Sequence, residues 1–167
     1  RFTRPISVAR SLPYDETSFS VYLNQLLGED WVLGAAYRAS EANLQINYEA
    51  PYDGTLTPGG RTSPNRDATS TLHQASGFVQ YTHACGAFLR FNTRWVQQSN
   101  RGDDASLLGD DFWQHDVLIG YRFWQRRAEV RVGILNLADA DYQLSPLNLR
   151  DELPRERTYY MSLRLQF

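Results

Sequence analysis

The chain has 167 residues, of which 42% are hydrophobic and 13% aromatic, and its formal net charge is −2. That charge excludes the strongly basic surface of a nucleic-acid-binding protein and a polybasic membrane patch. No run of about eighteen apolar residues occurs, which excludes a transmembrane helix but not membrane strands, whose alternating residues keep the mean hydropathy low. The length suffices for one domain, and the single cysteine, Cys85, excludes an internal disulfide.

The first sixteen residues carry only a weak strand signal. Pro5 and Pro13 argue against a central strand, so we expect residues 1–16 to form a loop end or an irregular strand. The chain begins at Arg1 without an initiator Met, which indicates a processed chain or a piece of a longer one.

Beyond this segment, strict alternation of apolar and polar residues predicts β-strands, because successive side chains of a strand point to opposite faces. A weaker alternation after residue 40 continues to Tyr48, and a strand of that length would reach beyond a bilayer. The predicted strands cover residues 18–26, 31–40, 77–83, 87–97, 112–124, 128–135 and 157–167.

The connections between these strands alternate between short and long. Short turns are expected near residues 28–30, 84–86 and 125–127, and long polar connections near residues 41–75, 98–110 and 138–156. Outer-membrane β-barrels have short periplasmic turns and longer extracellular loops. The alternation therefore predicts that the three short turns are periplasmic and the three long connections extracellular.

The charged residues of the predicted strands share one face. A lipid-facing Arg at the bilayer midplane would cost roughly 2–4 kcal/mol, so these charges are expected to line the lumen of a barrel. They could attract an anionic solute or a plug, but a lumen of Arg–carboxylate pairs built on Asp116 and Glu129 is the preferred interpretation. The lumen-facing candidates are Arg38, Arg90, Arg94, Asp116, Arg122, Glu129, Arg131 and Arg164.

The fold class expected from these patterns is all-β, an antiparallel transmembrane β-barrel with about seven or eight strands in this chain. A soluble antiparallel sheet with its core on the apolar face would give the same alternation and is the competing interpretation. Seven clear strands is an odd count, whereas bacterial single-chain barrels use even numbers. Either residues 1–10 supply an eighth strand, or the chain is the carboxyl-terminal part of a larger barrel.

The last strand resembles the closing strand of bacterial outer-membrane β-barrels, where a terminal Phe and apolar residues at every second position form the assembly signal. The resemblance implies recognition by the barrel-assembly machinery. A strand with free edge groups can be read by β-augmentation, in which alternate side chains provide specificity. The residues of this expected signal are Tyr159, Met161, Leu163, Leu165 and Phe167.

The final forty residues resemble the end of a TonB-dependent outer-membrane receptor. In that family an Asn-Leu-x-Asp-x-x-Tyr-like run ends the penultimate strand, as at residues 136–142, and a Pro-x-x-Arg-like run precedes the last strand, as at 154–157. The family often has Phe after Asn-Leu, where this chain has Ala138. The resemblance implies energy-coupled import of a scarce solute, with a plug domain and TonB as partners. The family's plug and TonB box do not occur here, which implies a barrel fragment.

No catalytic residue, metal site or cofactor is expected, and the chain is predicted not to be an enzyme. His73, His83 and His115 lack metal-ligand spacing, and His115 points away from its neighbour Asp116 on a strand. The acidic residues of the loop at 98–110 could bind Ca²⁺, but a solvated loop is the preferred interpretation; they are Asp103, Asp104, Asp110 and Asp111. Cys85 is expected to be a free thiol.

The sequence therefore predicts a section of a bacterial outer-membrane barrel in contact with lipid, with no nucleic-acid partner. The first hypothesis is a TonB-dependent receptor that imports a scarce solute such as a metal chelate. A passive or export channel of another large barrel family is the second. A small eight-stranded structural or adhesive barrel is the third.

Overall fold

A computed structural model of the chain describes residues 9–49, 66–102, 109–125, 127–149 and 153–166. The described chain is all-β and antiparallel, which confirms this part of the prediction; its one helical element is a 3-10 turn, η1 (Pro146–Asn148). No helix among these residues is long and apolar enough to cross a membrane. The strands are β1 (Ala9–Ser11), β2 (Tyr14–Leu27), β3 (Trp31–Glu49), β4 (Arg66–Thr82), β5 (Ala87–Gly102), β6 (Asp111–Phe123), β7 (Ala128–Leu135) and β8 (Thr158–Leu165).

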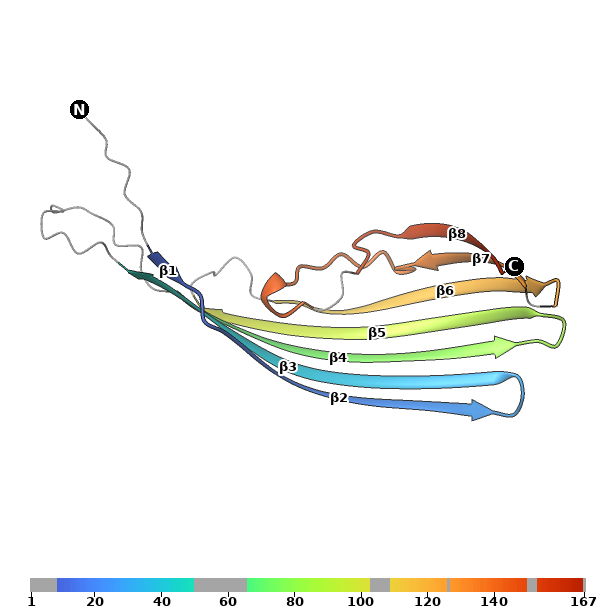
Figure 1. Cartoon of the computed structure of the whole chain (residues 1–167), viewed down its shortest axis with the longest axis horizontal. Coiled ribbons are helices and arrows are strands. Elements are labelled where there is room, and N and C mark those ends of the chain that lie inside the picture. The colour runs from blue at the N-terminus through green and yellow to red at the C-terminus, as the bar shows by residue number, and fades with distance from the viewer. Residues whose placement is uncertain (1–8, 50–65, 103–108, 126, 150–152, 167) are drawn as a thin grey trace, which may run out of the picture.

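The strands form one open, curved sheet in which each strand from β2 onward pairs with the next (Figure 1). β1 and β2 both pair with β3 in one continuous register, so they occupy a single position and seven strands lie side by side. The interruption falls at Pro13, which has no N–H to donate and is tolerated at a sheet edge. β1 therefore adds no eighth position to the sheet, and among the described residues β2 and β8 are its two edges.

Four strands extend beyond the ranges expected from strict alternation, which corrects the expected loop boundaries. β2 begins at Tyr14, inside the segment expected to be a loop end or an irregular strand. β3 runs to Glu49 and β4 begins at Arg66, so most of the connection expected near 41–75 is strand. β5 likewise continues to Gly102, inside the connection expected near 98–110. Residues 50–65 and 103–108 lie outside the described chain. In β3 the weaker alternation after residue 40 continues within the strand, with Leu44 and Ile46 on the same face as Arg38. At the ends of β4 and β5 both faces carry polar residues, so alternation disappears while backbone pairing continues, for example between Ser70 and Asn100.

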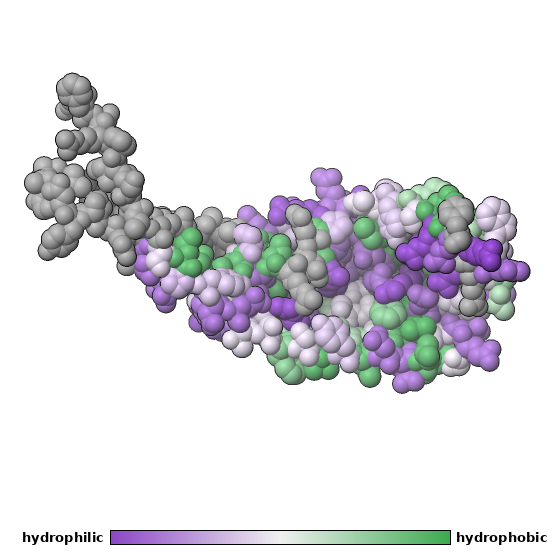
Figure 2. All heavy atoms as spheres, in the orientation of Figure 1, coloured by the Kyte–Doolittle hydropathy of each residue, from purple (hydrophilic) through white to green (hydrophobic). Residues whose placement is uncertain are grey.

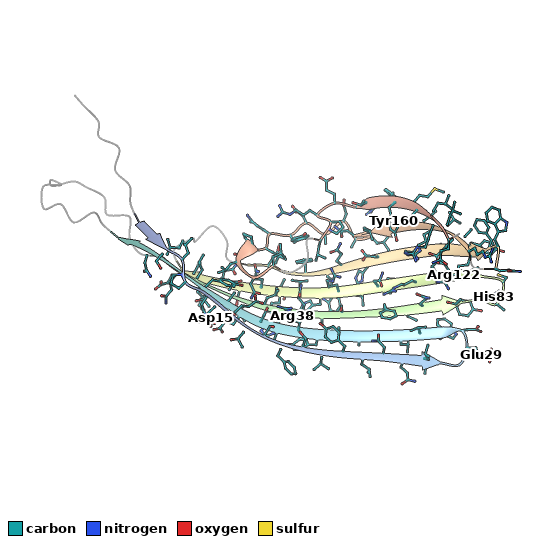
Figure 3. All side chains as sticks on the ribbon, viewed as in Figure 1. Asp15, Glu29, Arg38, His83, Arg122 and Tyr160 are labelled. Carbon is teal, nitrogen blue, oxygen red and sulfur yellow. The ribbon has the colours of Figure 1, made fainter. Side chains whose placement is uncertain are left out.

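The three short turns lie together at one end of the sheet. Figure 3 shows Glu29 and His83, from two of these turns, at the same end, and Asp15 and Arg38 towards the other. The amide of Thr82 donates to the carbonyl of Asp30 at 2.8 Å, which ties the end of β4 to the start of β3. In the β6–β7 turn, Trp124 and Gln125 adopt left-handed backbone conformations, with φ of 50° and 57°.

The buried residues lie on the polar face of the sheet rather than on the apolar face. Apart from Ala128, every buried residue of the described strands is on the face that carries Arg38 and Arg94. A small core forms on this face, where the chain after β7 folds back onto β4, β5 and β6. Its members are Leu72, Val96, Phe112, Tyr142, Leu144 and Leu153.

Candidate functional site

The cross-strand register places all eight charged lumen-facing candidates on one face of the sheet, hereafter the polar face. Arg38 pairs with Gln74, and Gln74 pairs with Val96, two residues from Arg94 on the same face of β5. At the other end of the sheet, Arg122, Glu129 and Arg164 lie opposite one another on β6, β7 and β8. That this face lines a lumen remains a prediction.

Glu129 holds two of these arginines. Its Oε2 accepts from Arg122 Nε at 2.7 Å, and its Oε1 accepts from Arg131 Nε. The Glu129 side chain is 9% exposed and the two Arg side chains are about one-third exposed, so the carboxylate is the buried centre of the group. A second pair joins Arg38 to Glu16 at 2.8 Å, with the Glu16 side chain 35% exposed.

Asp116 differs from Glu129, because no ion pair to it occurs within the described chain. Its Oδ1 accepts from the backbone amide of Asn136 at 2.9 Å. Arg90 lies with its guanidinium carbon 4.1 Å from the ring centre of Phe78, and its Nε donates to Asn92 Oδ1 at 2.8 Å. Arg–carboxylate pairing thus covers part of the polar face, around Glu129 and Glu16, and leaves Arg90 without a carboxylate among the described residues.

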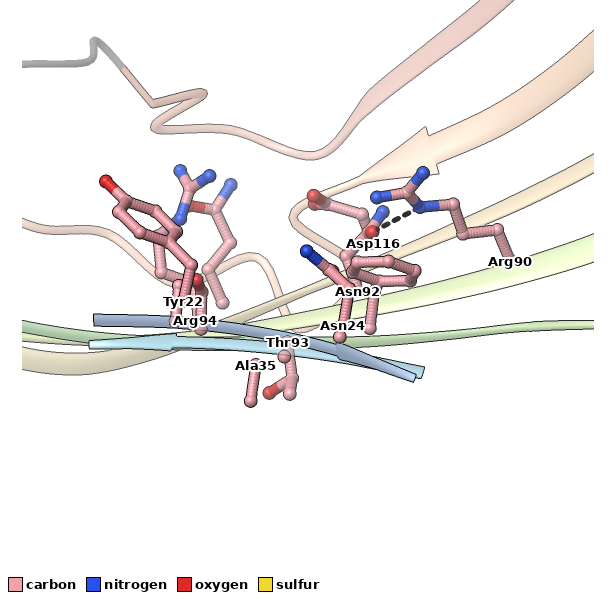
Figure 4. Close-up of a pocket in the computed structure, with 14 residues that line it drawn as sticks. Tyr22, Asn24, Ala35, Arg90, Asn92, Thr93, Arg94 and Asp116 are labelled. Atoms are coloured by element: carbon pink, nitrogen blue, oxygen red, sulfur yellow. Dashed lines mark hydrogen bonds between the residues drawn. The ribbon is translucent and has the colours of Figure 1, made fainter. Parts of the chain in front are cut away.

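A cavity of about 350 Å³ opens on the polar face over β2 to β6 (Figure 4). Most of its lining side chains are polar, and the charged ones are Arg90, Arg94 and Asp116. The close approach of Phe78 to Gly34 shapes one wall, since a Cβ at Gly34 would lie 2.1 Å from the Phe78 ring. A second cavity of about 280 Å³ adjoins the first and shares Arg94 with it.

The chain after β7, residues 136–149, folds back onto the polar face and is hereafter the latch. The Tyr142 ring stacks on Phe112 with ring centres 4.6 Å apart. Gln98 Oε1 accepts from the Ser145 amide at 2.6 Å, and Gln98 Nε2 donates to the Ser145 carbonyl at 3.2 Å. The connection expected near 138–156 is therefore attached to the sheet over its described part.

Asn148 anchors the far end of the latch. Its Oδ1 accepts from Ser40 Oγ at 2.9 Å, and its Nδ2 donates to the carbonyls of Ser40 and Ser70 at 3.1 and 2.9 Å. Sequence reasoning missed Asn148, Gln98 and Tyr142 as contact residues of this face. No local signal marks Ser40 and Ser70, the partners of Asn148, or Gln98, because polar residues are expected on this face in any case.

The residues that carry the receptor-like motif build the start of the latch. Asn136 is fully buried with φ of 51°, and its side chain exchanges hydrogen bonds at 2.9 Å with the amide and carbonyl of Ala140. Asp139 Oδ1 accepts from the Arg157 amide at 2.7 Å, which connects the latch to the segment entering β8. These residues therefore hold two strand ends together and do not line the cavity.

The opposite face of the sheet carries an exposed apolar belt. Windows of nine residues, 19–27, 31–39 and 113–121, span about 30 Å along a strand, the length of a membrane strand. Aromatic pairs lie near both ends: Trp31 with Tyr81 at 4.8 Å, and Trp95 with Trp113 at 6.5 Å. The exposed large members are Phe19, Val21, Leu23, Leu27, Trp31, Leu33, Tyr37, Leu89, Trp113, Ile119, Tyr121, Val132, Tyr159, Met161, Leu163 and Leu165.

The histidines lie apart from one another. His73 Nδ1 is 2.8 Å from Tyr37 Oη, His83 Nδ1 is 3.0 Å from Cys85 Sγ, and His115 Nδ1 is 3.0 Å from Thr93 Oγ1. His115 lies on the apolar face and Asp116 on the polar face. The described residues hold no group of three His, Cys, Asp or Glu side chains that could bind a metal ion. Asp103 and Asp104 lie outside the described chain.

Comparison of this chain with protein-family models, with curated protein sequences and with solved structures finds no match in any of the three.

Proposed function

We propose that this sheet is a section of the wall of a bacterial outer-membrane β-barrel, with the apolar belt against lipid and the polar face towards the interior. The chain would then contribute to a channel or receptor and not to a soluble domain. The short turns would lie on the periplasmic side, and the opposite ends of β3, β4 and β5 would project outside the cell.

The observation that carries the proposal is which face of the sheet is covered. In a soluble antiparallel sheet the apolar face packs against the core and the polar face meets water. Here Ile119 and Met161 on the apolar face are 61% and 72% exposed, whereas Val96 on the polar face is fully buried. An exposed apolar surface of this extent needs an apolar environment, and the nine-residue aromatic-bounded belt fits the apolar band of a membrane barrel.

The open edges support a barrel larger than this sheet. Unpaired backbone groups at a strand edge are too costly in the hydrocarbon core, so a membrane sheet must close on itself. Among the described strands β2 and β8 do not pair with each other, and further strands between them would close the sheet. This favours a section of a large barrel over a complete eight-stranded structural or adhesive barrel.

Within the large barrels we favour a TonB-dependent receptor that imports a scarce solute such as a metal chelate. The support is the receptor-like sequence around Asn136 and Arg157, whose residues here build the junction of latch and β8. A plug domain and TonB would be the partners. A passive or export channel of another family is the second candidate, because the same wall could enclose an open pore.

Labelling of Cys85 in intact cells tests the membrane proposal. Cys85 lies exposed in the β4–β5 turn, so a membrane-impermeant maleimide should react with it only after the outer membrane is permeabilised. The full-length protein, with any cysteine other than Cys85 replaced by Ser, should fractionate with the outer membrane. Ready labelling from outside, or recovery in a soluble fraction, would contradict the proposal.

Capture by immobilised TonB separates the two candidate families. The detergent-solubilised full-length protein should be retained if it is a TonB-dependent receptor and should pass through if it is a passive or export channel. A soluble periplasmic protein provides the control for nonspecific retention.

A further inference from the structure

Two arginines of the polar-face cavity differ from three others on this face. Arg38 is paired with Glu16, and Arg122 and Arg131 share Glu129. Arg90 and Arg94 both line the cavity, and neither has a carboxylate partner within the described chain. They lie four residues apart on β5, so both side chains project from the same face.

The carboxylate that lines the same cavity does not neutralise these arginines. Asp116 Oδ1 is engaged by the backbone amide of Asn136, and Arg90 Nε is engaged by Asn92. With two guanidinium groups and one carboxylate among its described lining residues, the cavity carries a net positive charge. A guanidinium binds a carboxylate through two parallel N–H···O bonds, which gives geometric specificity as well as attraction.

The cavity also holds a buried acceptor without a donor. Gln114 lies directly opposite Arg94 in the β5–β6 register and is 4% exposed. Its Nε2 donates to the Pro154 carbonyl at 3.4 Å, but its Oε1 has no hydrogen-bond partner. A buried acceptor of this kind is unfavourable unless something donates to it. A hydroxyl group next to an anion held by Arg94 would meet this requirement.

We propose that the cavity binds a small hydroxylated carboxylate, with its carboxylate on Arg94 and a hydroxyl donating to Gln114 Oε1, while Arg90 adds positive charge at the opposite end of the cavity (Figure 4). The volume of about 350 Å³ falls within the range of small-molecule sites. Tyr22, Asn24 and Asn92 provide further polar groups for additional hydroxyls. The inference rests on the proposed function, in which the polar face lines the path of an imported solute, and it names the chemistry of that solute.

Calorimetric titration of the detergent-purified full-length protein tests the proposal with three probes. Gluconate has a carboxylate and hydroxyls, hexanoate has only the carboxylate, and glucose has only the hydroxyls. Gluconate should bind most tightly, hexanoate about fivefold more weakly for the lost hydroxyl contact, and glucose at least tenfold more weakly for the lost charge-assisted contacts. Gluconate binding should weaken as ionic strength rises.

Three variants test which residues contact gluconate. R94Q should weaken the binding of gluconate at least tenfold, and Q114L should abolish the preference for gluconate over hexanoate. In Q114L the Pro154 carbonyl still accepts a hydrogen bond from Asn136 Nδ2 at 3.3 Å, so that variant should fold. R164Q removes the same charge from the same face but outside this cavity, and it should bind gluconate like the parent protein.

Absence of gluconate binding, equal binding of gluconate and glucose, or equal effects of R94Q and R164Q would each overturn the inference. A negative titration is distinguishable from failure of the membrane proposal, because Cys85 labelling does not depend on solute binding. A protein that passes the labelling test and fails the titration would be a membrane barrel with a different solute.

Discussion

At the scale of single residues, glycines on the polar face make room for aromatic rings from the neighbouring strand. A Cβ at Gly120 would lie 2.2 Å from Phe88, and one at Gly133 would lie 2.3 Å from Tyr160. Phe88 is buried and lies under Arg122, whose guanidinium carbon is 4.6 Å from the ring centre. The described strands hold three such pairs, with Gly34 and Phe78 as the third, so this packing repeats across the sheet.

Replacing Gly120 by Ala should therefore displace Phe88 and lower the free energy of unfolding by about 1–3 kcal/mol. Gly77→Ala is the matched control, because its Cβ would lie 3.5 Å from the nearest atom, an ordinary contact. The control should change stability by less than about 0.5 kcal/mol. Urea unfolding of the folded protein in lipid measures both values, and equal losses would show that the ring contact is unimportant.

Glu129→Gln tests the charge cluster on β6 and β7. The substitution leaves Arg122 and Arg131 without their shared carboxylate, and we expect a loss of about 2 kcal/mol. Glu16→Gln is the control, since the Glu16–Arg38 pair is more exposed and its loss should cost about 1 kcal/mol or less. The same unfolding assay applies, and a larger loss in the Glu16 variant would contradict this ranking.

At the scale of elements, the latch is the part of the structure that the sequence does not reveal. Asn148 contacts Ser40 across 108 residues of chain, and Gln98 contacts Ser145 across 47. No local pattern encodes contacts over such separations. The faces of the strands, by contrast, are predictable, because alternation assigns them locally. The register brings the predicted polar positions of all seven neighbouring strands to one side.

Asn148→Ala should release the far end of the latch. Its three hydrogen bonds contribute roughly 2–3 kcal/mol together, so the Leu147 amide and its neighbours should exchange hydrogen at least tenfold faster. Gln143→Ala changes an exposed side chain of the same segment and should leave exchange unchanged. Similar exchange in both variants would mean that Asn148 does not hold the latch in place.

At the scale of the whole molecule, alternation predicts antiparallel strands but does not choose between water and lipid for the apolar face. Whether the apolar face meets water or lipid depends on which face the rest of the chain covers. That in turn depends on how segments distant in the sequence fold. Here the latch covers Leu72 and Phe112 on the polar face. Figure 2 shows patches of apolar residues along the lower edge of the molecule and another at its upper right. The far ends of β4 and β5 are not predictable from alternation, because polar residues on both faces hide them, whereas the weaker alternation to Tyr48 does follow β3.

The most direct test of the account compares neighbouring residues of opposite parity in the lipid-reconstituted full-length protein. Spin labels would be attached singly at Leu118 and Ile119 on β6 and at Met161 and Ser162 on β8. Labels at Ile119 and Met161 should collide mainly with oxygen, which concentrates in lipid, and labels at Leu118 and Ser162 should not. Equal accessibility to oxygen and to a polar reagent at both positions of each pair would contradict a lipid-facing apolar belt.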